Sequence, residues 1–254
     1  ERVGYMIIIK TEQEIQMMKK AGELLAKTHK EIAKMIKPGV TTYEIDQFVE
    51  EYLKKHNATP EQKGYYGYPY ATCASINDEI CHGFPRKEPL KNGDIVTIDM
   101  VVNLDGWLAD SAWSYGVGEI SDEARKLLDV TKKALYIGIE KAVIGNRIGD
   151  ISHAIQTYVE SEGFSVVRDF VGHGIGRNMH EDPQVPHFGR PGRGPRLMEG
   201  MVLTIEPMVN VGEYHCTIDD NQWTARTIDG KLSAQYEHTL AITKDGPLIL
   251  TDQG

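Results

Sequence analysis

The feature of this sequence that most constrains its fold is an internal repeat of helices and strands. At a shift of about 106 residues, the following pairs coincide: Gly39 with Gly145, Glu44 with Asp150, Ile45 with Ile151, Val49 with Ile155, and Tyr52 with Tyr158. At a shift of about 107 residues, Gly-Asp-Ile-Val-Thr-Ile-Asp at 93–99 matches Gly-Met-Val-Leu-Thr-Ile-Glu at 200–206. Two amphipathic helices could match by chance, because they share a period. We interpret the combined matches as a divergent duplication of a helix–helix–strand unit.

The repeat predicts an α+β fold made of two related halves, roughly residues 6–118 and 119–254. The economical arrangement places the halves across a pseudo-twofold axis, with the sheet inside and the helices outside. A chain of 254 residues can form one domain or two. Because no linker of shifted composition separates the halves, we expect a single catalytic domain of residues 6–254.

Helical periodicity and capping residues predict the elements of each half. The predicted helices lie at 11–36, 42–56, 121–143 and 150–162. Thr11 and Ser121 are the expected N-caps of the first and third helices. The predicted strands lie at 73–81, in a hairpin at 93–110, at 200–206 and at 233–242. The segment 189–195, Gly-Arg-Pro-Gly-Arg-Gly-Pro, has too many helix and strand breakers for regular structure and is expected to be a surface loop.

Composition and charge narrow the class of protein. Hydrophobic residues make up 41% of the chain, and no apolar run approaches the ~20 residues of a membrane span. Cys73, Cys81 and Cys216 cannot all pair and lack metal-finger spacing, which favours a reducing compartment. A net charge of −9 argues against nucleic acid as the main partner. We therefore expect a cytoplasmic protein without a membrane or direct nucleic-acid partner, and we expect residues 1–5 to be a vector-derived remnant before a native start at Met6.

Two carboxylates, Asp99 and Asp110, fall within the predicted hairpin among apolar neighbours. Asp is depleted in strands, and an unpaired charge in an apolar layer is costly or stays protonated. A two-residue turn at Asp105-Gly106, or a four-residue turn at 103–106, puts both acids on one face of the hairpin, whereas a three-residue turn separates them. A bound cation would explain two acids in this position.

Three further residues complete a set of candidate metal ligands. His173 lies among glycines in Val-Gly-His-Gly-Ile-Gly, where backbone and ligands can approach closely. Glu206 ends the repeated strand, and Glu237 lies in the middle of an apolar strand. Any one of these residues could be a paired acid or a core histidine. Together with Asp99 and Asp110 they give four carboxylates and one imidazole, which suit two divalent cations sharing a water of lowered pKa.

The candidate ligands lie within motifs that extend along most of the chain. These motifs are Cys81-His82-Gly, Asp99 followed by Asp110, Gly-His173-Gly-Ile-Gly-Arg-Asn-Met-His180-Glu-Asp-Pro, Thr-Ile-Glu206-Pro-Met, and Ala-Gln-Tyr-Glu237-His-Thr. Their order resembles that of the methionine aminopeptidases, in the short bacterial form of type I. The resemblance extends from Met6 to the end of the chain. It implies the pita-bread fold, in which two related halves surround a curved antiparallel sheet.

The resemblance also implies a role for each candidate ligand. Asp99 would chelate one metal, and His173 and Glu206 would bind the other. Asp110 and Glu237 would bridge the two metals. The cofactors would be two divalent ions, for which Co, Mn, Fe and Zn are all candidates. A hydroxide bound to both metals would attack the carbonyl of an N-terminal methionine.

Three residues would act directly on the reaction, according to the same resemblance. Glu206, besides binding metal, would serve as the proton shuttle. His180 would stabilise the tetrahedral oxyanion. His82 would contact the scissile amide nitrogen or the backbone of the next residue. From the residues alone, either histidine could instead be a surface or core histidine.

The resemblance further implies a pocket for the methionine side chain. The residues expected to bind substrate are Tyr65, Tyr68, Cys73, His82, Met179, His180 and Trp223. Aromatic rings and a thiol suit a flexible thioether, because sulfur–aromatic contacts stabilise by ~0.3–1.5 kcal/mol. Read without the family, Tyr-Gly-Tyr-Pro-Tyr at 66–70 could be an ordinary packed loop. The sequence departs from some relatives at Gln62, Tyr66 and Met179. These departures leave the exact shape of the pocket undetermined, but they do not affect the expected metal ligands.

We therefore expect a metalloaminopeptidase that removes the initiator methionine from nascent polypeptides with a small second residue. Its partners would be nascent N-termini and the ribosome, and we expect a monomer. One rival is an X-Pro aminopeptidase or prolidase, although these usually carry an additional N-terminal domain and only about 90 residues precede Asp99 here. The other rival is a non-catalytic pita-bread binding protein, which would lose metal ligands that this chain retains.

Overall fold

The computed structural model describes residues 6–254, so the expectation that residues 1–5 are a vector remnant lies outside the described residues. The long helices are α1 (Glu12–Met35), α2 (Thr42–Lys55), α3 (Asp122–Glu140) and α4 (Ile148–Ser161), and Tyr65–Gly67 forms a short 3₁₀ turn. The strands are β1 (Thr59–Pro60), β2 (Cys73–Ile76), β3 (Glu79–Cys81), β4 (Ile95–Leu104), β5 (Trp107–Gly116), β6 (Ser165–Val166), β7 (Gly172–Gly174), β8 (Glu181–Val185), β9 (Val202–Ile205), β10 (Met208–Asn210), β11 (Cys216–Ile218), β12 (Ala225–Thr227), β13 (Ser233–Gln235), β14 (His238–Thr243) and β15 (Gly246–Ile249). The helix–helix–strand order thus occurs twice, as the sequence repeat predicts.

The helix starts are set by side chains that bind free backbone N–H groups. Thr11 and Ser121 cap α1 and α3 as predicted, each accepting a hydrogen bond from the N–H three residues on. The fourth helix begins at Ile148, two residues earlier than predicted. Asp150, expected to start this helix, instead occupies its third position, where its carboxylate accepts the N–H of Arg147 at 2.7 Å. The acid therefore caps the helix from within its first turn.

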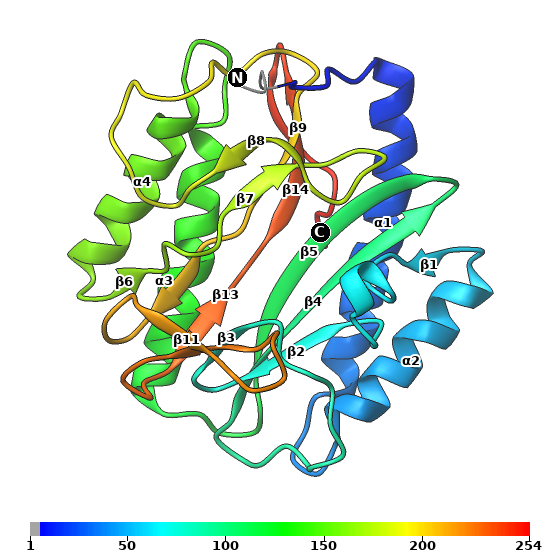
Figure 1. The fold of residues 1–254 in the computed structure, drawn as a ribbon, viewed down its shortest axis with the longest axis vertical. Coiled ribbons are helices and arrows are strands. Elements are labelled where there is room, and N and C mark those ends of the chain that lie inside the picture. Colours follow the sequence, from blue (N-terminus) through cyan, green and yellow to red (C-terminus); the bar gives the residue numbers. More distant parts are fainter. Residues whose placement is uncertain (1–5) are drawn as a thin grey trace.

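The strands of each half form an antiparallel sheet between the two helix pairs, with α1 and α2 on one side and α3 and α4 on the other (Figure 1). In the first half, β4 pairs with β5 on one edge and with β1 and β2 on the other. In the second half, the sheet order is β15-β14-β9-β7-β8. Two smaller sheets have the strand orders β13-β10-β6 and β11-β12-β3, and the second joins β3 of the first half to β11 and β12 of the second.

The two halves meet along β5, where Ala112 forms a backbone bridge with Glu237 and the hydroxyl of Thr239 on β14 bonds to the backbone of Asp110. The N–H of Glu237 donates to the carbonyl of Ala112 at 2.9 Å. The prediction of one continuous strand at 233–242 is wrong, because the segment is divided into β13 and β14 on either side of Glu237. The break lets the backbone of Glu237 leave one sheet and pair with the other half, which places its side chain at the junction.

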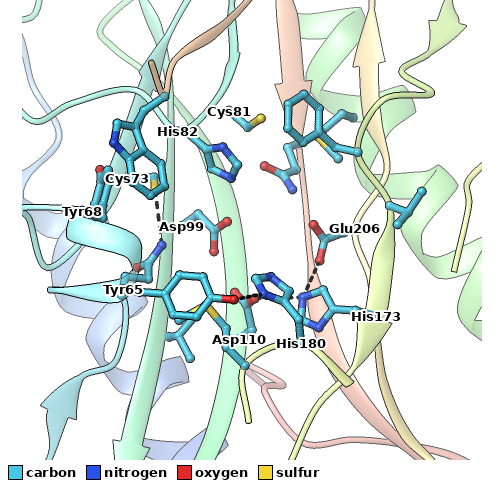
Figure 2. A pocket seen from close by; sticks show the side chains of 18 residues that line it. Tyr65, Tyr68, Cys73, Cys81, His82, Asp99, Asp110, His173, His180 and Glu206 are labelled. Carbon is cyan, nitrogen blue, oxygen red and sulfur yellow. Dashed lines mark hydrogen bonds and ion pairs between the residues drawn. The ribbon is translucent and has the colours of Figure 1, made fainter. Parts of the chain in front are cut away.

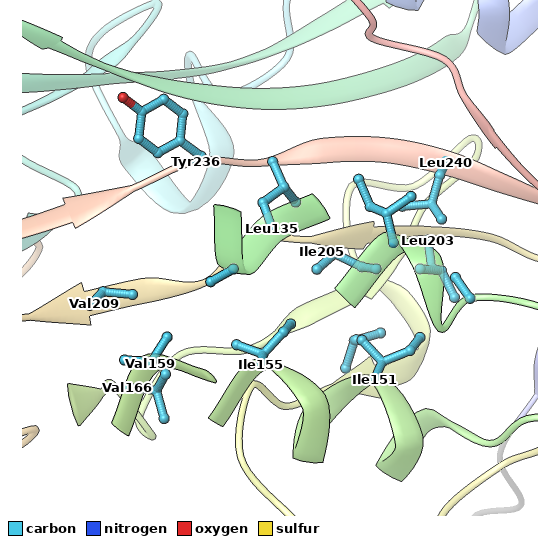
Figure 3. Close-up of a cluster of buried hydrophobic side chains, with 14 of the residues drawn as sticks. Leu135, Ile151, Ile155, Val159, Val166, Leu203, Ile205, Val209, Tyr236 and Leu240 are labelled. Carbon is cyan, nitrogen blue, oxygen red and sulfur yellow. The ribbon is translucent and has the colours of Figure 1, made fainter. Parts of the chain in front are cut away.

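Each helix pair is held against its sheet by apolar side chains. In the second half, Leu135 of α3 and Ile151 and Ile155 of α4 pack with Leu203 and Leu240 of the sheet (Figure 3). All five are completely buried. Full burial of each such side chain stabilises the fold by ~1.5–3 kcal/mol.

The first half has a corresponding core between α1, α2 and β4, which contains Leu25, Ile45, Val49, Ile98 and Met100. Both sheets are therefore covered on their outer faces, and polar residues of the inner faces are free to form a site. Within residues 6–254, no helix has the length and apolar character needed to cross a membrane.

Candidate metal centre

The β4–β5 hairpin places two acids on its inner face. The strands are joined by the two-residue turn Asp105-Gly106, whose φ angles of 55° and 87° are those that a tight hairpin turn requires. The register pairs Asp99 with Ala112 and Asp110 with Val101. Because alternate residues of a strand share a face, Asp99 and Asp110 lie diagonally on the same face. Of the three turn lengths that the sequence left open, this is one of the two that place both acids on one face.

The other three candidate ligands reach the same place from the second half. His173 lies on β7, Glu206 directly follows β9, and Glu237 occupies the break between β13 and β14. One ligand atom from each of Asp110, His173, Glu206 and Glu237 lies within 4.8 Å of all the others. Asp99 borders this group from β4 (Figure 2). The structure therefore brings together all five residues that the sequence proposed as ligands.

The glycines beside His173 allow neighbouring strands to approach its backbone closely. A Cβ atom at Gly172 would lie 2.4 Å from the carbonyl oxygen of Thr204, and one at Gly174 would lie 2.1 Å from that of Asp182. Side chains at these two positions would push β7 away from its neighbours. The close packing that these glycines allow thus places the imidazole of His173 beside the carboxylates.

Hydrogen bonds fix the orientation of two candidate ligands. His173 Nδ1 lies 2.9 Å from the carbonyl oxygen of Gly174, to which it donates, so Nε2 faces the carboxylates. Nε2 is 3.5 Å from Asp110 Oδ2 and 3.5 Å from Glu206 Oε2. Thr204 connects the two strands, because its hydroxyl accepts the N–H of His173 at 3.1 Å and donates to Glu206 Oε2 at 2.8 Å.

Several carboxylate oxygens of this cluster have no hydrogen-bond partner within residues 6–254. They are Asp99 Oδ1, Asp110 Oδ1 and both side-chain oxygens of Glu237, all buried. Buried polar atoms are nearly always paired, and an isolated buried carboxylate is strongly unfavourable. Cations bound between these oxygens and His173 Nε2 would supply the missing partners. The donor set, hard oxygens with one imidazole, fits the divalent metal ions expected from the sequence.

The protonation of the cluster reflects the same excess of negative charge. Burial raises the pKa of Asp99, Glu206 and Glu237 above the usual range. Burial acts in the same direction on Asp110, but the hydrogen bonds with His173, Asp99 and Glu237 and the charge of His173 together outweigh it and hold the pKa of Asp110 at about 2. Burial would lower the pKa of His173, yet the adjoining carboxylates raise it to about 9. The site is therefore built to hold positive charge.

A cavity of about 160 Å³ opens beside the cluster, far larger than the ~10–15 Å³ that one water needs. It is lined by Gln62, Tyr65, Tyr68, Cys73, Cys81, His82, Asp99, Val101, Asp110, Phe170, Val171, His173, Met179, His180, Glu206, Met208, Trp223 and Gln235. Every residue predicted to bind substrate, and every predicted ligand except Glu237, lies on this wall. Figure 2 shows Asp99, Asp110 and Glu206 in the same pocket as Tyr65, Tyr68, His82 and His180.

Two histidines face the cavity from opposite sides. His180 Nδ1 lies 2.9 Å from the hydroxyl of Tyr65, and its ring is 4.5 Å from that of His173. His82 packs edge-on against Phe170 at 5.4 Å and has a positive φ of 57°, which is uncommon for a side chain that is not glycine. Burial lowers the pKa of both His82 and His180, so both rings are neutral at pH 7.

The aromatic wall contains residues from both halves. Tyr68 and Trp223 meet edge-to-face with ring centroids 5.1 Å apart. The amide of Gln62 lies 3.3 Å from Cys73 Sγ, and its NH₂ group is placed to donate to the carbonyl of Asp99. Of the three departures from the family pattern, Gln62 and Met179 line the cavity, whereas Tyr66 is 84% exposed outside it.

Some residues of the site were not found from the sequence. Phe170, Met208 and Gln235 line the cavity, and each lies within three residues of a predicted ligand, which is the signal that could have identified them. Thr204 could have been noticed in the repeated strand, where it matches Thr97. His187 accepts a hydrogen bond from the N–H of Glu206 and has no such signal, because only the fold brings it near.

Known proteins have similar sequences and the same fold. The model of metallopeptidase family M24 matches residues 16–244. A methionine aminopeptidase of Clostridium perfringens is 56% identical over 246 residues, which cover 97% of this chain and 99% of that protein. The crystal structure of methionine aminopeptidase from Rickettsia prowazekii superposes with a TM-score of 0.96 at 45% identity, over 97% of this chain and 100% of that one.

A more distant structure shares the fold alone. Prolidase from Pyrococcus furiosus superposes with a TM-score of 0.77 at 23% identity, and the match covers 97% of this chain but 66% of the prolidase. The pita-bread architecture expected from the sequence is therefore confirmed. The buried acid–imidazole cluster, the family match and the near full-length relatives agree. The chain belongs to metallopeptidase family M24 and, within it, to the methionine aminopeptidases.

Proposed function

We propose that this protein is a metal-dependent aminopeptidase that removes the N-terminal methionine from polypeptides with a small second residue. The observation that carries the proposal is the buried cluster of Asp110, His173, Glu206 and Glu237 at the inner end of a cavity lined by aromatic rings and sulfur. The near full-length relatives named methionine aminopeptidases support it. The preference for a small second residue rests on the family resemblance alone.

The five acidic and imidazole ligands would hold two divalent metal ions, in the arrangement expected from the sequence. Bound there, such ions polarise a carbonyl and lower the pKa of a water towards neutrality. The protein's contribution is to orient the ligands. Thr204 fixes the carboxylate of Glu206, and the carbonyl of Gly174 fixes the tautomer of His173. Glu206 is also our candidate for moving the proton, as the family resemblance implies.

His180 and His82 would act on the peptide itself. Because the Tyr65 hydroxyl lies at Nδ1 of His180, a proton on Nε2 makes that nitrogen a donor towards the cavity. A neutral donor there suits the oxygen of the scissile carbonyl as negative charge develops on it. His82, on the opposite wall, would contact the scissile nitrogen or the backbone of the next residue.

The methionine side chain would occupy the aromatic part of the cavity. Tyr68, Trp223 and Tyr65 offer ring faces and edges, and Cys73 and Met179 add polarizable sulfur. Contacts between a thioether and aromatic rings stabilise by ~0.3–1.5 kcal/mol each. A shorter aliphatic side chain would lose these contacts, so we expect methionine to be preferred.

The rival functions receive less support. The likeness to prolidases lies under 25% identity and concerns the fold. A non-catalytic binding protein would not need five polar ligands at a buried junction. We retain as proposals that residues 6–254 act as one catalytic domain, that the protein is a cytoplasmic monomer, and that it meets nascent chains at the ribosome.

The proposal is tested by peptide hydrolysis. Chelator-stripped protein is assayed with Met-Ala-Ser and Met-Pro-Ala before and after addition of Mn, Co, Fe or Zn. We expect release of free methionine from Met-Ala-Ser only with metal, no release by Glu206→Ala, and normal release by the control Glu199→Ala, which changes an exposed acid. Cleavage confined to Met-Pro-Ala would favour the X-Pro enzymes. No cleavage of either peptide by folded protein would favour a binding protein.

A further inference from the structure

His187 is a completely buried side chain that the proposed chemistry does not use. Its Nε2 accepts a hydrogen bond from the backbone N–H of Glu206 at 3.0 Å. A neutral imidazole has one acceptor nitrogen, so the ring proton lies on Nδ1. Among the described residues, Nδ1 has no hydrogen-bond partner. An unpaired buried donor destabilises the fold by ~1–3 kcal/mol. An apolar side chain in this space would therefore give a more stable protein, unless the hydrogen bond of Nε2 is required.

The backbone of Glu206 needs an acceptor from outside its own sheet. β9 ends at Ile205, and its ladder with β14 covers only residues 202–205. The following residue, Pro207, has no N–H and cannot continue a ladder. The N–H of Glu206 therefore lies beyond the last strand pair, and His187 takes the place that a neighbouring strand would have.

The loop that carries His187 is held by helix α4. The hydroxyl of Ser152 donates to the carbonyl of Pro186, and the N–H of Gly189 donates to Gln156 Oε1 at 3.0 Å. Both contacts lie within two residues of His187, one on each side. The path from α4 to Glu206 thus runs through the hydrogen bonds to Pro186 and Gly189, along the loop backbone to His187, and through the hydrogen bond from the N–H of Glu206 to His187 Nε2.

We propose that His187 is a positioning residue, whose Nε2 fixes the backbone at Glu206 so that this carboxylate meets Asp110, His173 and Glu237 in the geometry that a metal ion requires. The backbone contact from His187 and the side-chain contact from Thr204 together constrain Glu206 at both ends. The inference rests on the proposed role of Glu206 as a ligand. Loss of a group that orients a ligand typically lowers metal affinity by about 10–100-fold.

A matched pair of variants tests the inference. His187→Gln keeps an acceptor oxygen at a similar reach, whereas His187→Met fills a similar volume with a much weaker acceptor. Each full-length, chelator-stripped variant is titrated with Mn²⁺ by calorimetry, its melting temperature is measured without metal, and kcat and KM are measured with Met-Ala-Ser. We expect His187→Met to bind Mn²⁺ about 10–100-fold more weakly, with reduced kcat and little change in KM. His187→Gln should bind within about threefold of the unmodified protein.

A purely structural role predicts a different result. Both variants would then melt at lower temperature without metal and bind Mn²⁺ as tightly as the unmodified protein, which would overturn the inference. A Gln variant as defective in Mn²⁺ binding as the Met variant would also overturn it. If His187→Met does not fold, Ser152→Ala replaces it: weaker Mn²⁺ binding at an unchanged melting temperature supports the inference, and unchanged binding overturns it. If the unmodified protein and Glu206→Ala bind Mn²⁺ equally, the proposed metal site fails instead.

Discussion

Replacing Glu237 by glutamine should stabilise the metal-free protein and remove its response to metal. Glu237 is fully buried, and in the part of the chain that the structure describes neither of its carboxylate oxygens has a hydrogen-bond partner. Burial, with the neighbouring acids, raises its pKa well above 4.5. Between pH 4.5 and the raised pKa of Glu237, the unfolded chain therefore ionises this group while the folded protein keeps it protonated. Each further pH unit in that range removes about 1.4 kcal/mol from the free energy of unfolding.

The magnitude of the effect can be worked from this slope. Between pH 5.5 and pH 7.5, Glu237 would cost the metal-free protein up to about 2.7 kcal/mol. At about 2–4 °C per kcal/mol for a chain of this size, that is about 5–11 °C in melting temperature. The same change deletes a ligand. Metal at a hundred times its Kd stabilises a protein by about 2.7 kcal/mol, so the unmodified protein should gain a similar increment that the variant lacks.

The assay is thermal unfolding of chelator-stripped protein at pH 5.5 and 7.5, with and without Mn²⁺. Glu237→Gln is compared with the unmodified protein and with Glu23→Gln, which changes an exposed acid on α1. We expect the Glu237 variant to lose less stability than the other two as the pH rises, and to show little shift with Mn²⁺. A variant that is less stable at pH 7.5 and still responds fully to Mn²⁺ would refute the reasoning.

Two further predictions concern residues near the site. Thr204→Val removes the hydroxyl that joins His173 to Glu206, so we expect this variant to bind Mn²⁺ more weakly, as measured by calorimetry. A hydrogen bond to a charged group contributes ~1.5–3 kcal/mol, so the variant should also lose stability of that order, whereas Thr204→Ser should not. Equal Mn²⁺ affinities of the Val and Ser variants would argue against this role. His29 is fully buried, and burial lowers its pKa from 6.5 to about 4. Below pH 6.5 the unfolded chain binds a proton that the folded protein excludes, so stability falls as the pH drops, by about 2 kcal/mol at pH 5. Urea unfolding of His29→Gln should show a smaller decrease, and an identical decrease would exclude His29 as the cause.

Features that depend on local sequence could be predicted well. Thr11 and Ser121 identified two helix starts, because a capping hydroxyl and its target N–H lie three residues apart. The turn at Asp105-Gly106 limited the hairpin to a few registers, one of which is observed. That register places Asp99 and Asp110 on one face, since strand faces alternate strictly. The internal sequence repeat, in addition, predicted that two related halves would be arranged around a common sheet region.

Features that depend on contacts between distant segments could not be predicted from local patterns. The apolar run around Glu237 reads as one continuous strand, yet pairing with Ala112 breaks it. His187 lies 19 positions before Glu206, and its role follows only from the end of β9 at Ile205. The ligand set itself was assigned with the help of the family resemblance. From residue types alone, each acid had an ordinary structural alternative.

The most direct test of the central claim is to locate the metal. Crystals of the protein grown with Mn²⁺ would be measured at a wavelength where manganese scatters anomalously. The account predicts two anomalous peaks roughly 3.5–4 Å apart between Asp110 and Glu237, with Asp99 against one peak, and His173 and Glu206 against the other. Absence of any peak at these side chains, in crystals of folded protein saturated with Mn²⁺, would contradict it.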